Sequence, residues 1–336
     1  MTAETKNKKP SNFFQRLIKS KVFWLIIAFF IFLWLNNTSL FVNRSGKKAT
    51  LIAHRALGQT YDLEGIKWNT NTAAIIHKPE YPYIENTLPS IRAAFDYGTE
   101  IVEFDIRMTA DKQLAVFHDY TLEYRTNGKG NVSEHTMAEL RQLDVGYGYT
   151  ADNGKTFPLR GTGIGLLVSI EDVFRAFPDK KFLLHIKDEG NEVGPVLLEF
   201  LKTLDQSEIN NLSVYGNDLA LDLLREHYPK MKVLTKSRMI DALLSYMFIG
   251  WTGYIPGKAH NMELHLPVRY AKFLWGWPDK FLERMEQANT RVVLVRYVNG
   301  WSDGFDSQAD LKTLPANYTG GIWTDRIDII GPVLKK

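Results

Sequence analysis

The stretch IVEFDIRMTADKQLAVFHD, residues 101–119, decides the fold. It contains two apolar runs, 101–106 and 113–118, that are each typical of a β-strand, and only residues 107–112 separate them. A crossover between parallel strands needs about a dozen residues or more, so these two strands are expected to form a hairpin. The second run then adds no strand to a parallel sheet and carries His118 back over the end of the first.

Further apolar runs follow the same pattern along the chain, and helical periodicity lies between most of them. The strands expected besides 101–106 are 50–54, 182–187, 211–215, 232–235, 262–266, 292–297 and 320–324. Eight strands joined by helical connections predict a (β/α)8 TIM barrel over residues 50–333, with the extra hairpin after the second strand.

The N-terminal segment differs in charge and hydropathy from the rest of the chain. Residues 1–21 hold six Lys/Arg and one acid, and residues 22–42 are apolar except for a short polar stretch, 36–39. Twenty-one residues are long enough to cross about 30 Å of hydrocarbon. The basic flank favours a cytoplasmic tail, 1–21, then a transmembrane signal anchor, 22–42, and a linker, 43–49, with the barrel on the extracytoplasmic side. A cleaved signal peptide is the alternative, although no small-residue cleavage site follows the apolar run.

Composition excludes several classes of protein. The 336 residues contain no cysteine, which rules out a disulfide framework, a thiolate metal site and a cysteine nucleophile. Residues 49–336 carry 32 Lys/Arg and 37 Asp/Glu, so the barrel is mildly acidic and is not expected to bind nucleic acid.

The polar residues suited to chemistry follow the predicted strands at their carboxyl ends, where a barrel places its active site. They are His54 and Arg55, Glu103 and Asp105, His118, and His185 and Lys187, with Glu85 opening the helix after the first strand. Two close carboxylates repel one another unless a cation lies between them, which favours a Mg²⁺, Ca²⁺ or Mn²⁺ site. Histidines suit acid–base work, and cationic side chains suit a phosphate, so the combination indicates phosphodiester cleavage.

Several motifs in order resemble the glycerophosphodiester phosphodiesterase family. They are Leu51–Arg55, Glu85–Thr87, Ile101–Asp105, Thr109–Asp111, Val116–Asp119, Arg125–Gly130, Val168–Val173 and Gly321–Asp325. The likeness covers about residues 50–187 and 320–326, and the part between them is only loosely similar. It implies a barrel enzyme that hydrolyses a glycerophosphodiester, or a lysophospholipid, to glycerol 3-phosphate, or a lysophosphatidic acid, and an alcohol.

The resemblance also implies a role for each matching residue. His54 and His118 match the acid/base pair, and Arg55 and Lys187 match phosphate-binding cations. Glu103 and Asp105 match two metal ligands, and Glu85 matches a glutamate that usually lies near the metal.

Three departures from the family pattern accompany the likeness. Ala56 replaces the usual glycine after His-Arg, and the segment from there to Glu85 is longer than usual. His185 stands where the family has its third metal carboxylate, which would favour Mn²⁺ or Zn²⁺ over Ca²⁺ and Mg²⁺. Glu263, on a later predicted strand, is a candidate substitute ligand.

Two other functions remain open from the sequence. One is a lipase D-like lyase, in which a substrate hydroxyl attacks phosphorus and leaves a cyclic phosphate. The other is a phospholipid-headgroup binding module that lost activity with the third carboxylate. The expected partners are a small glycerophosphodiester or lysophospholipid, and a membrane reached through the N-terminal helix.

Overall fold

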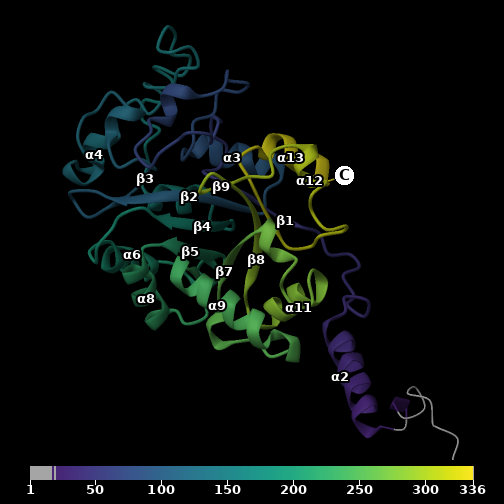
Figure 1. Cartoon of the computed structure of the whole chain (residues 1–336). Helices are drawn as coiled ribbons and strands as arrows, with labels where there is room; N and C mark the ends of the chain where they lie inside the picture. The colour runs from purple at the N-terminus through teal and green to yellow at the C-terminus, as the bar shows by residue number, and fades with distance from the viewer. Residues whose placement is uncertain (1–16, 19, 336) are drawn as a thin grey trace, which may run out of the picture.

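The fold is described from a computed structural model that covers residues 17–18 and 20–335 of the chain (Figure 1). The basic tail predicted over residues 1–21 therefore lies mostly outside the described residues. The strands are β1 (Thr50–Ala53), β2 (Ile101–Met108), β3 (Leu114–Val116), β4 (Lys181–Ile186), β5 (Leu212–Gly216), β6 (Lys232–Leu234), β7 (Glu263–Pro267), β8 (Arg291–Val298), β9 (Trp301–Asp303) and β10 (Gly321–Thr324).

The parallel strands form a nearly closed barrel in the order β6-β5-β4-β2-β1-β10-β8-β7. A single parallel bridge between Val233 and Met262 links the two ends of this order. All eight barrel strands predicted from the apolar runs are present, with bounds that differ by one or two residues. The barrel prediction is therefore confirmed.

Two strands lie outside the barrel as antiparallel additions. β3 pairs with β2 in the predicted hairpin, with Ile106 opposite Val116, and Lys112 takes a positive φ of 58° in the turn. β9 pairs in the same way with the end of β8, which the sequence did not indicate. Both hairpins extend strands beyond their carboxyl ends and so rise beside the mouth of the barrel.

Helices cover the outside of the barrel (Figure 1). They are α3 (Leu88–Tyr97), α4 (Met137–Leu140), α5 (Ile170–Ala176), α6 (Val193–Leu201), α7 (Gln206–Asn210), α8 (Asp218–His227), α9 (Lys236–Ile249), α10 (Val268–Ala271), α11 (Asp279–Gln287), α12 (Gln308–Leu311) and α13 (Ile327–Lys335). Short 3₁₀ helices are η1 (Thr72–Ile75), η2 (Leu122–Tyr124), η3 (Val132–Glu134), η4 (Gly250–Thr252) and η5 (Gly257–Ala259).

Helix α3 shows how local sequence sets these boundaries. Thr87 caps its N-terminus by accepting a hydrogen bond from the backbone NH of Ser90, and Gly98 ends it in the left-handed conformation with φ 100°. Ile91 and Ala94 are fully buried on the face that the 3.6-residue period predicts. The capped start fixes where Glu85 and Asn86 enter the barrel mouth.

The alternation of side chains along β2 separates two layers of packing. Val102, Phe104 and Ile106 point outward into the large core between strands and helices. Ile101 points inward and packs with the apolar residues of the barrel interior. Because strand side chains alternate, Glu103 and Asp105 share this inward direction, and both are fully buried.

The N-terminal helix α2 (Lys21–Asn37) ends earlier than the predicted span 22–42, and its C-terminal end docks on the barrel. Buried Arg284 donates hydrogen bonds to the carbonyl of Asn36 (2.7 Å) and to Oδ1 of Asn37 (3.0 Å). The Oγ of Ser39 then accepts from the backbone NH of Asp279 (3.1 Å). These contacts turn the chain at residues 38–42, so that part of the predicted span is not helical.

Across residues 17–18 and 20–335, none of the helices combines the length and the apolar character needed to cross a membrane.

Candidate active site

Five of the predicted site residues line one cavity of about 1600 Å³ at the carboxyl ends of the strands: His54, Arg55, His118, His185 and Lys187. His54 and Arg55 reach it directly after β1, and His118 follows β3. His185 lies near the end of β4, and Lys187 comes directly after that strand. Asp325, which follows β10, lines the same cavity, so the two ends of the barrel domain meet here.

Glu103, Asp105 and His185 form a compact group of ligand atoms, all within 4.8 Å of one another. Burial and the charge of Asp105 raise the pKa of Glu103 to about 7. For Asp105, burial alone would raise the pKa, but His118, His185 and nearby cations hold it well below its usual value. Burial and the charge of Lys187 lower the pKa of His185 to about 4, so its imidazole is neutral at neutral pH.

This donor set fits a divalent cation. Oδ1 of Asp105 is buried and accepts no hydrogen bond, although Nδ1 of His185 lies 2.9 Å from it. The other oxygens are held in place: Tyr215 donates to Oε1 of Glu103 (2.7 Å), and Asn86 donates to Oδ2 of Asp105 (3.0 Å). A buried carboxylate oxygen without a donor, next to a neutral imidazole, has the chemistry of a metal-ligand pair.

Arg55 is fixed at the centre of the site by a strained turn. Arg55 and Ala56 both have positive φ, 49° and 67°, a conformation that costs a residue with a Cβ about 1 kcal/mol or more. The backbone NH of Arg55 donates a hydrogen bond to Oε2 of Glu103 (2.7 Å). The guanidinium then donates to Oε1 of Glu85 (3.1 Å) and lies 2.7 Å from Nε2 of His118. Ala56 thus occupies a position where the usual glycine would be unstrained.

His118 is oriented from both ring nitrogens. Its Nδ1 lies 2.6 Å from Oδ1 of Asp119. Its Nε2 accepts hydrogen bonds from the guanidinium of Arg55 and from the ammonium of Lys187 (3.1 Å). Burial, followed by the charges of Arg55 and Lys187, holds the pKa of His118 well below its usual value. The histidine is therefore a neutral imidazole whose Nε2 lone pair accepts from these two cationic groups.

The pKa of His54 is shifted in the opposite direction. Its Nδ1 lies 2.6 Å from Oδ1 of Asp325, and its ring packs against Trp323 with the centroids 4.7 Å apart. Burial alone would lower the pKa of His54, but the charge and hydrogen bond of Asp325 outweigh burial and raise it. Asp325 is itself fixed, because its backbone NH donates to Oδ1 of Asp306 (2.8 Å).

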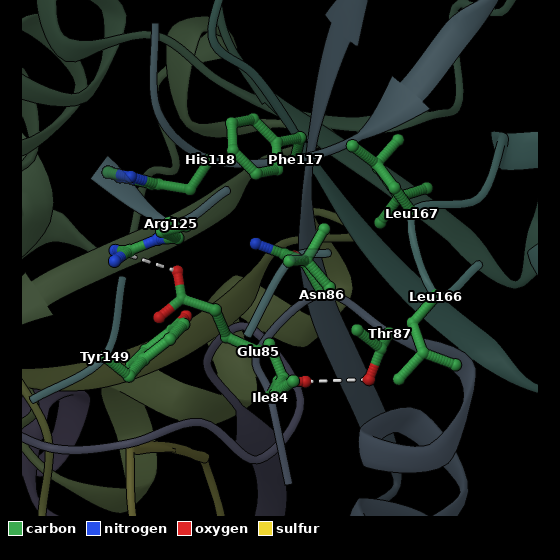
Figure 2. Close-up of a pocket in the computed structure, with 12 residues that line it drawn as sticks. Ile84, Glu85, Asn86, Thr87, Phe117, His118, Arg125, Tyr149, Leu166 and Leu167 are labelled. Carbon is green, nitrogen blue, oxygen red and sulfur yellow. Dashed lines mark hydrogen bonds and ion pairs between the residues drawn. The ribbon is translucent and has the colours of Figure 1, made fainter. Parts of the chain in front are cut away.

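Glu85 lies behind the site rather than in the metal-ligand group. Its carboxylate points toward the guanidinium of Arg125, 3.2 Å away, and both side chains are buried beside Tyr149 (Figure 2). Nε of Arg125 also contacts Oδ2 of Asp119 at 3.1 Å. Glu85 therefore helps to position Arg55 through a direct hydrogen bond, and Arg125 helps to position His118 through Asp119.

Glu263 also lies outside the metal-ligand group. It begins β7 and pairs with Arg291, whose Nη1 lies 2.9 Å from Oε2. The predicted alternation is present, since His265 shares the inward side and packs against Trp323 and Tyr215. Glu263 thus faces the barrel interior, but at the amino end of its strand.

Sequence reasoning did not assign roles to Asp119, Arg125 and Asp325. Each belongs to a motif on which the family resemblance rests, so the motifs themselves carried the signal. Asp119 adjoins His118 in sequence, whereas the partner of His54 lies 271 positions away. Tyr215 and Asn86, which donate to the carboxylates of Glu103 and Asp105, were likewise not assigned a role.

Comparison with known proteins gives the site a context. Residues 54–236 match the model of the glycerophosphoryl diester phosphodiesterase family. A glycerophosphodiester phosphodiesterase of Caldanaerobacter subterraneus is 33% identical over 117 residues, covering 34% of this chain and 44% of that protein. A lysophospholipase D of Rattus norvegicus is 27% identical over 190 residues, which cover 55% of this chain and 57% of that protein. The chain thus spans about half the length of these relatives.

Solved structures share the fold at low sequence identity. A glycerophosphodiester phosphodiesterase from Agrobacterium tumefaciens superimposes with a TM-score of 0.57 at 16% identity, covering 86% of this chain and 100% of that one. A phosphodiesterase from Oleispira antarctica, solved with the product sn-glycerol-3-phosphate, superimposes with a TM-score of 0.54 at 17% identity. The superposition covers 85% of this chain and 97% of that one. Because the family model matches more than half of its residues, the chain belongs to the glycerophosphoryl diester phosphodiesterase family.

Proposed function

We propose that this chain is a membrane-anchored, metal-dependent phosphodiesterase. It hydrolyses glycerophosphodiesters or lysophospholipids to glycerol 3-phosphate or a lysophosphatidic acid, and releases an alcohol. The observation that carries the proposal is the pair of histidines, His54 and His118, each with an aspartate on Nδ1, which line one cavity with Arg55 and Lys187. Two relatives are called a glycerophosphodiester phosphodiesterase and a lysophospholipase D, which supports both substrate classes.

The opposite pKa directions of the two histidines suggest their roles. His118, with its pKa lowered, is the base: once Arg55 and Lys187 bind the phosphate instead of Nε2, this atom accepts the proton of the attacking water. His54, with its pKa raised, retains its proton to higher pH than an ordinary histidine and donates it to the oxygen of the leaving alcohol. Arg55 and Lys187 supply positive charge for the phosphate oxygens, and this charge stabilises the transition state more than the ground state.

Glu103, Asp105 and His185 would hold the divalent metal, which supplies Lewis-acid polarisation of the phosphate when bound. Glu85 and Glu263 are less suited, because their carboxylates are paired with arginines. Mg²⁺, Ca²⁺ and Mn²⁺ all accept carboxylate oxygens, while the imidazole favours Mn²⁺ or Zn²⁺.

Metal affinity measured by calorimetry tests the role of His185 without relying on turnover. In His185→Glu the preference should shift from Mn²⁺ toward Mg²⁺ or Ca²⁺, and His185→Ala should bind each metal more weakly. Equal affinities in the wild type and both variants would show that His185 is not a ligand.

Membrane attachment is proposed from the surface of α2. None of its residues is buried, and exposed apolar side chains such as Trp24, Phe30 and Leu35 lie along its length. The excess of Lys/Arg in residues 1–21 favours a cytoplasmic N-terminus and a catalytic domain on the extracytoplasmic side. Protease accessibility of the barrel in intact cells, compared with lysed cells, tests this orientation.

The activity is tested with purified protein on glycerophosphocholine, glycerophosphoethanolamine, glycerophosphoglycerol and lysophosphatidylcholine, each with and without added metal. Phosphorus NMR identifies the product: glycerol 3-phosphate or lysophosphatidic acid supports hydrolysis, and a cyclic phosphate would indicate the lyase. Absence of turnover on all substrates with every divalent metal would overturn the proposal.

A further inference from the structure

The long segment between Arg55 and Glu85 places apolar side chains on the wall of the catalytic cavity. Tyr61, Leu63, Ile66 and Trp68 all line the cavity that also contains His54. A loop at the mouth of a barrel is ordinarily polar, since it faces water. Four apolar or aromatic side chains within eight residues therefore indicate that an apolar part of a ligand packs here, because the polar catalytic groups do not cover this surface.

These side chains do not contribute to the folded core. Leu63 and Ile66 belong to none of the core clusters of the described residues and remain partly exposed. Trp68 is 88% exposed, the highest value among the large apolar residues of the described chain. Their burial contributes little to the stability of the barrel, so a stabilising role does not account for them.

The segment is nevertheless held in place at several points. The amide of Gln59 donates to the carbonyls of Tyr81 and Tyr83, and the backbone NH of His77 donates to the carbonyl of Thr60 (2.8 Å). At the other end of the apolar stretch, the hydroxyl of Tyr124 donates to the carbonyl of Asn69 (3.0 Å). The apolar wall is thus preformed, which reduces the entropy lost when a ligand binds.

The cavity is larger than the catalytic groups require. At about 1600 Å³ it exceeds the roughly 300–1,000 Å³ of ordinary small-molecule pockets. Its polar end, at His54, Arg55 and Lys187, is suited to a phosphodiester. Further aromatic side chains, Tyr120 and Trp301, line other parts of the cavity. A glycerophosphodiester with a small polar alcohol would leave this apolar surface in contact with water.

We propose that residues 61–68 form an acyl-chain subsite, which makes a single-chain lysophospholipid the preferred substrate. This inference rests on the proposed function and narrows its substrate class. The phosphodiester lies between His54 and His118, and the acyl chain extends along Leu63, Ile66 and Trp68. Each methylene buried there should improve kcat/KM by roughly fourfold until the wall is covered.

The experiment compares monomeric lysophosphatidylcholines of increasing acyl length, below their micelle-forming concentrations, with glycerophosphocholine. In the wild type, kcat/KM should rise with chain length. In Leu63→Ser/Ile66→Ser and in Trp68→Ala, the ratio of kcat/KM for the longest lysolipid to that for glycerophosphocholine should fall by about tenfold or more. A folding defect lowers both rates together and leaves this ratio unchanged.

Ile75→Ser is the matched control. Ile75 belongs to the same segment and is 44% exposed, but it does not line the cavity. The ratio of kcat/KM for the longest lysolipid to that for glycerophosphocholine should therefore be the same in Ile75→Ser as in the wild type. A chain-length dependence that is absent in the wild type, or unchanged in the cavity variants, would overturn the subsite while leaving the phosphodiesterase activity intact.

Binding of dodecylphosphocholine as a monomer, measured by calorimetry, separates the subsite from catalysis. This probe has a single chain and a phosphodiester but no glycerol. Binding that weakens at least tenfold in Leu63→Ser/Ile66→Ser, and not in Ile75→Ser, supports the subsite even if no substrate is turned over. Equal binding by all three proteins would refute it.

Discussion

Asp325→Asn is predicted to move the alkaline limb of the pH–rate profile to lower pH. In the proposed reaction His54 must hold a proton, so activity falls as pH rises through its pKa. Asp325 raises that pKa through its charge and through the contact of 2.6 Å with Nδ1. Asparagine keeps the size of the side chain but removes the charge, and burial alone then lowers the pKa of His54.

The size of the shift follows from the geometry. A hydrogen bond to a charged group contributes about 1.5–3 kcal/mol, and one pKa unit corresponds to about 1.4 kcal/mol. The Asp325 side chain is 33% exposed, so solvent screens part of its charge and the lower end of the range applies. The substitution should therefore remove about 1.5 kcal/mol of stabilisation from the protonated imidazole, so the pKa of His54 and the alkaline limb of kcat/KM should both move to lower pH.

The assay is the pH dependence of kcat/KM on glycerophosphocholine, paired with an NMR titration of the histidine ring protons. Asp62→Asn provides a matched control, because Asp62 also contacts a histidine, His77, but on an exposed surface with a distance of 3.2 Å. The control should leave the profile unchanged. If Asp325→Asn moves the His54 titration to lower pH and the alkaline limb does not follow it, the proposed acid role of His54 is wrong.

The remaining predictions concern catalysis and stability. His54→Ala and His118→Ala should each lower kcat by about 10²–10⁴-fold without lowering Tm, which steady-state kinetics and circular dichroism check together. Arg125→Ala should destabilise the fold by about 3–5 kcal/mol in urea unfolding, because it removes a buried cation that two buried carboxylates, Glu85 and Asp119, share; an unchanged midpoint would contradict the buried network. A chain that begins at Lys47 lacks the residues that pair with Arg284 and should be less stable, by about 1–3 kcal/mol, than one that begins at Lys21.

The barrel could be predicted because each strand is a short apolar run flanked by polar residues. The hairpin followed from length alone, since Arg107–Lys112 cannot make a parallel crossover. Alternation gave the shared direction of Glu103 and Asp105. These features depend on local spacing, which a single sequence records directly.

The partner of His54 depends on closure of the barrel instead. Ala53 pairs with Thr324 across β1 and β10, so the residues that follow them, His54 and Asp325, are neighbours at the mouth. A closed barrel always places its last strand beside its first, so this contact could have been inferred from the predicted fold. The docking of α2 could not, because no periodic pattern indicates that Arg284 binds Asn36 and Asn37.

Glu263 shows the limit of an alternation argument. The period of two correctly gives its inward direction, but it does not give depth along the barrel axis. Glu263 is paired in register with Arg291, which satisfies its charge near the amino ends of both strands. Depth depends on strand register and barrel shear, and both are set by the whole sheet.

His185 can be interpreted only with the positions of its neighbours known. β4 pairs in register with β2, which places His185 opposite Asp105, and stacking on Tyr215 with the ring centroids 4.0 Å apart fixes the imidazole plane. The replacement therefore removes one negative charge from the site but retains a donor atom, Nδ1, close to the buried Oδ1 of Asp105. A cation bound there would keep more of its positive charge for the phosphate, at the expense of weaker binding. The position of Nδ1 beside a buried carboxylate oxygen supports the proposal of an altered metal preference over that of a lost site.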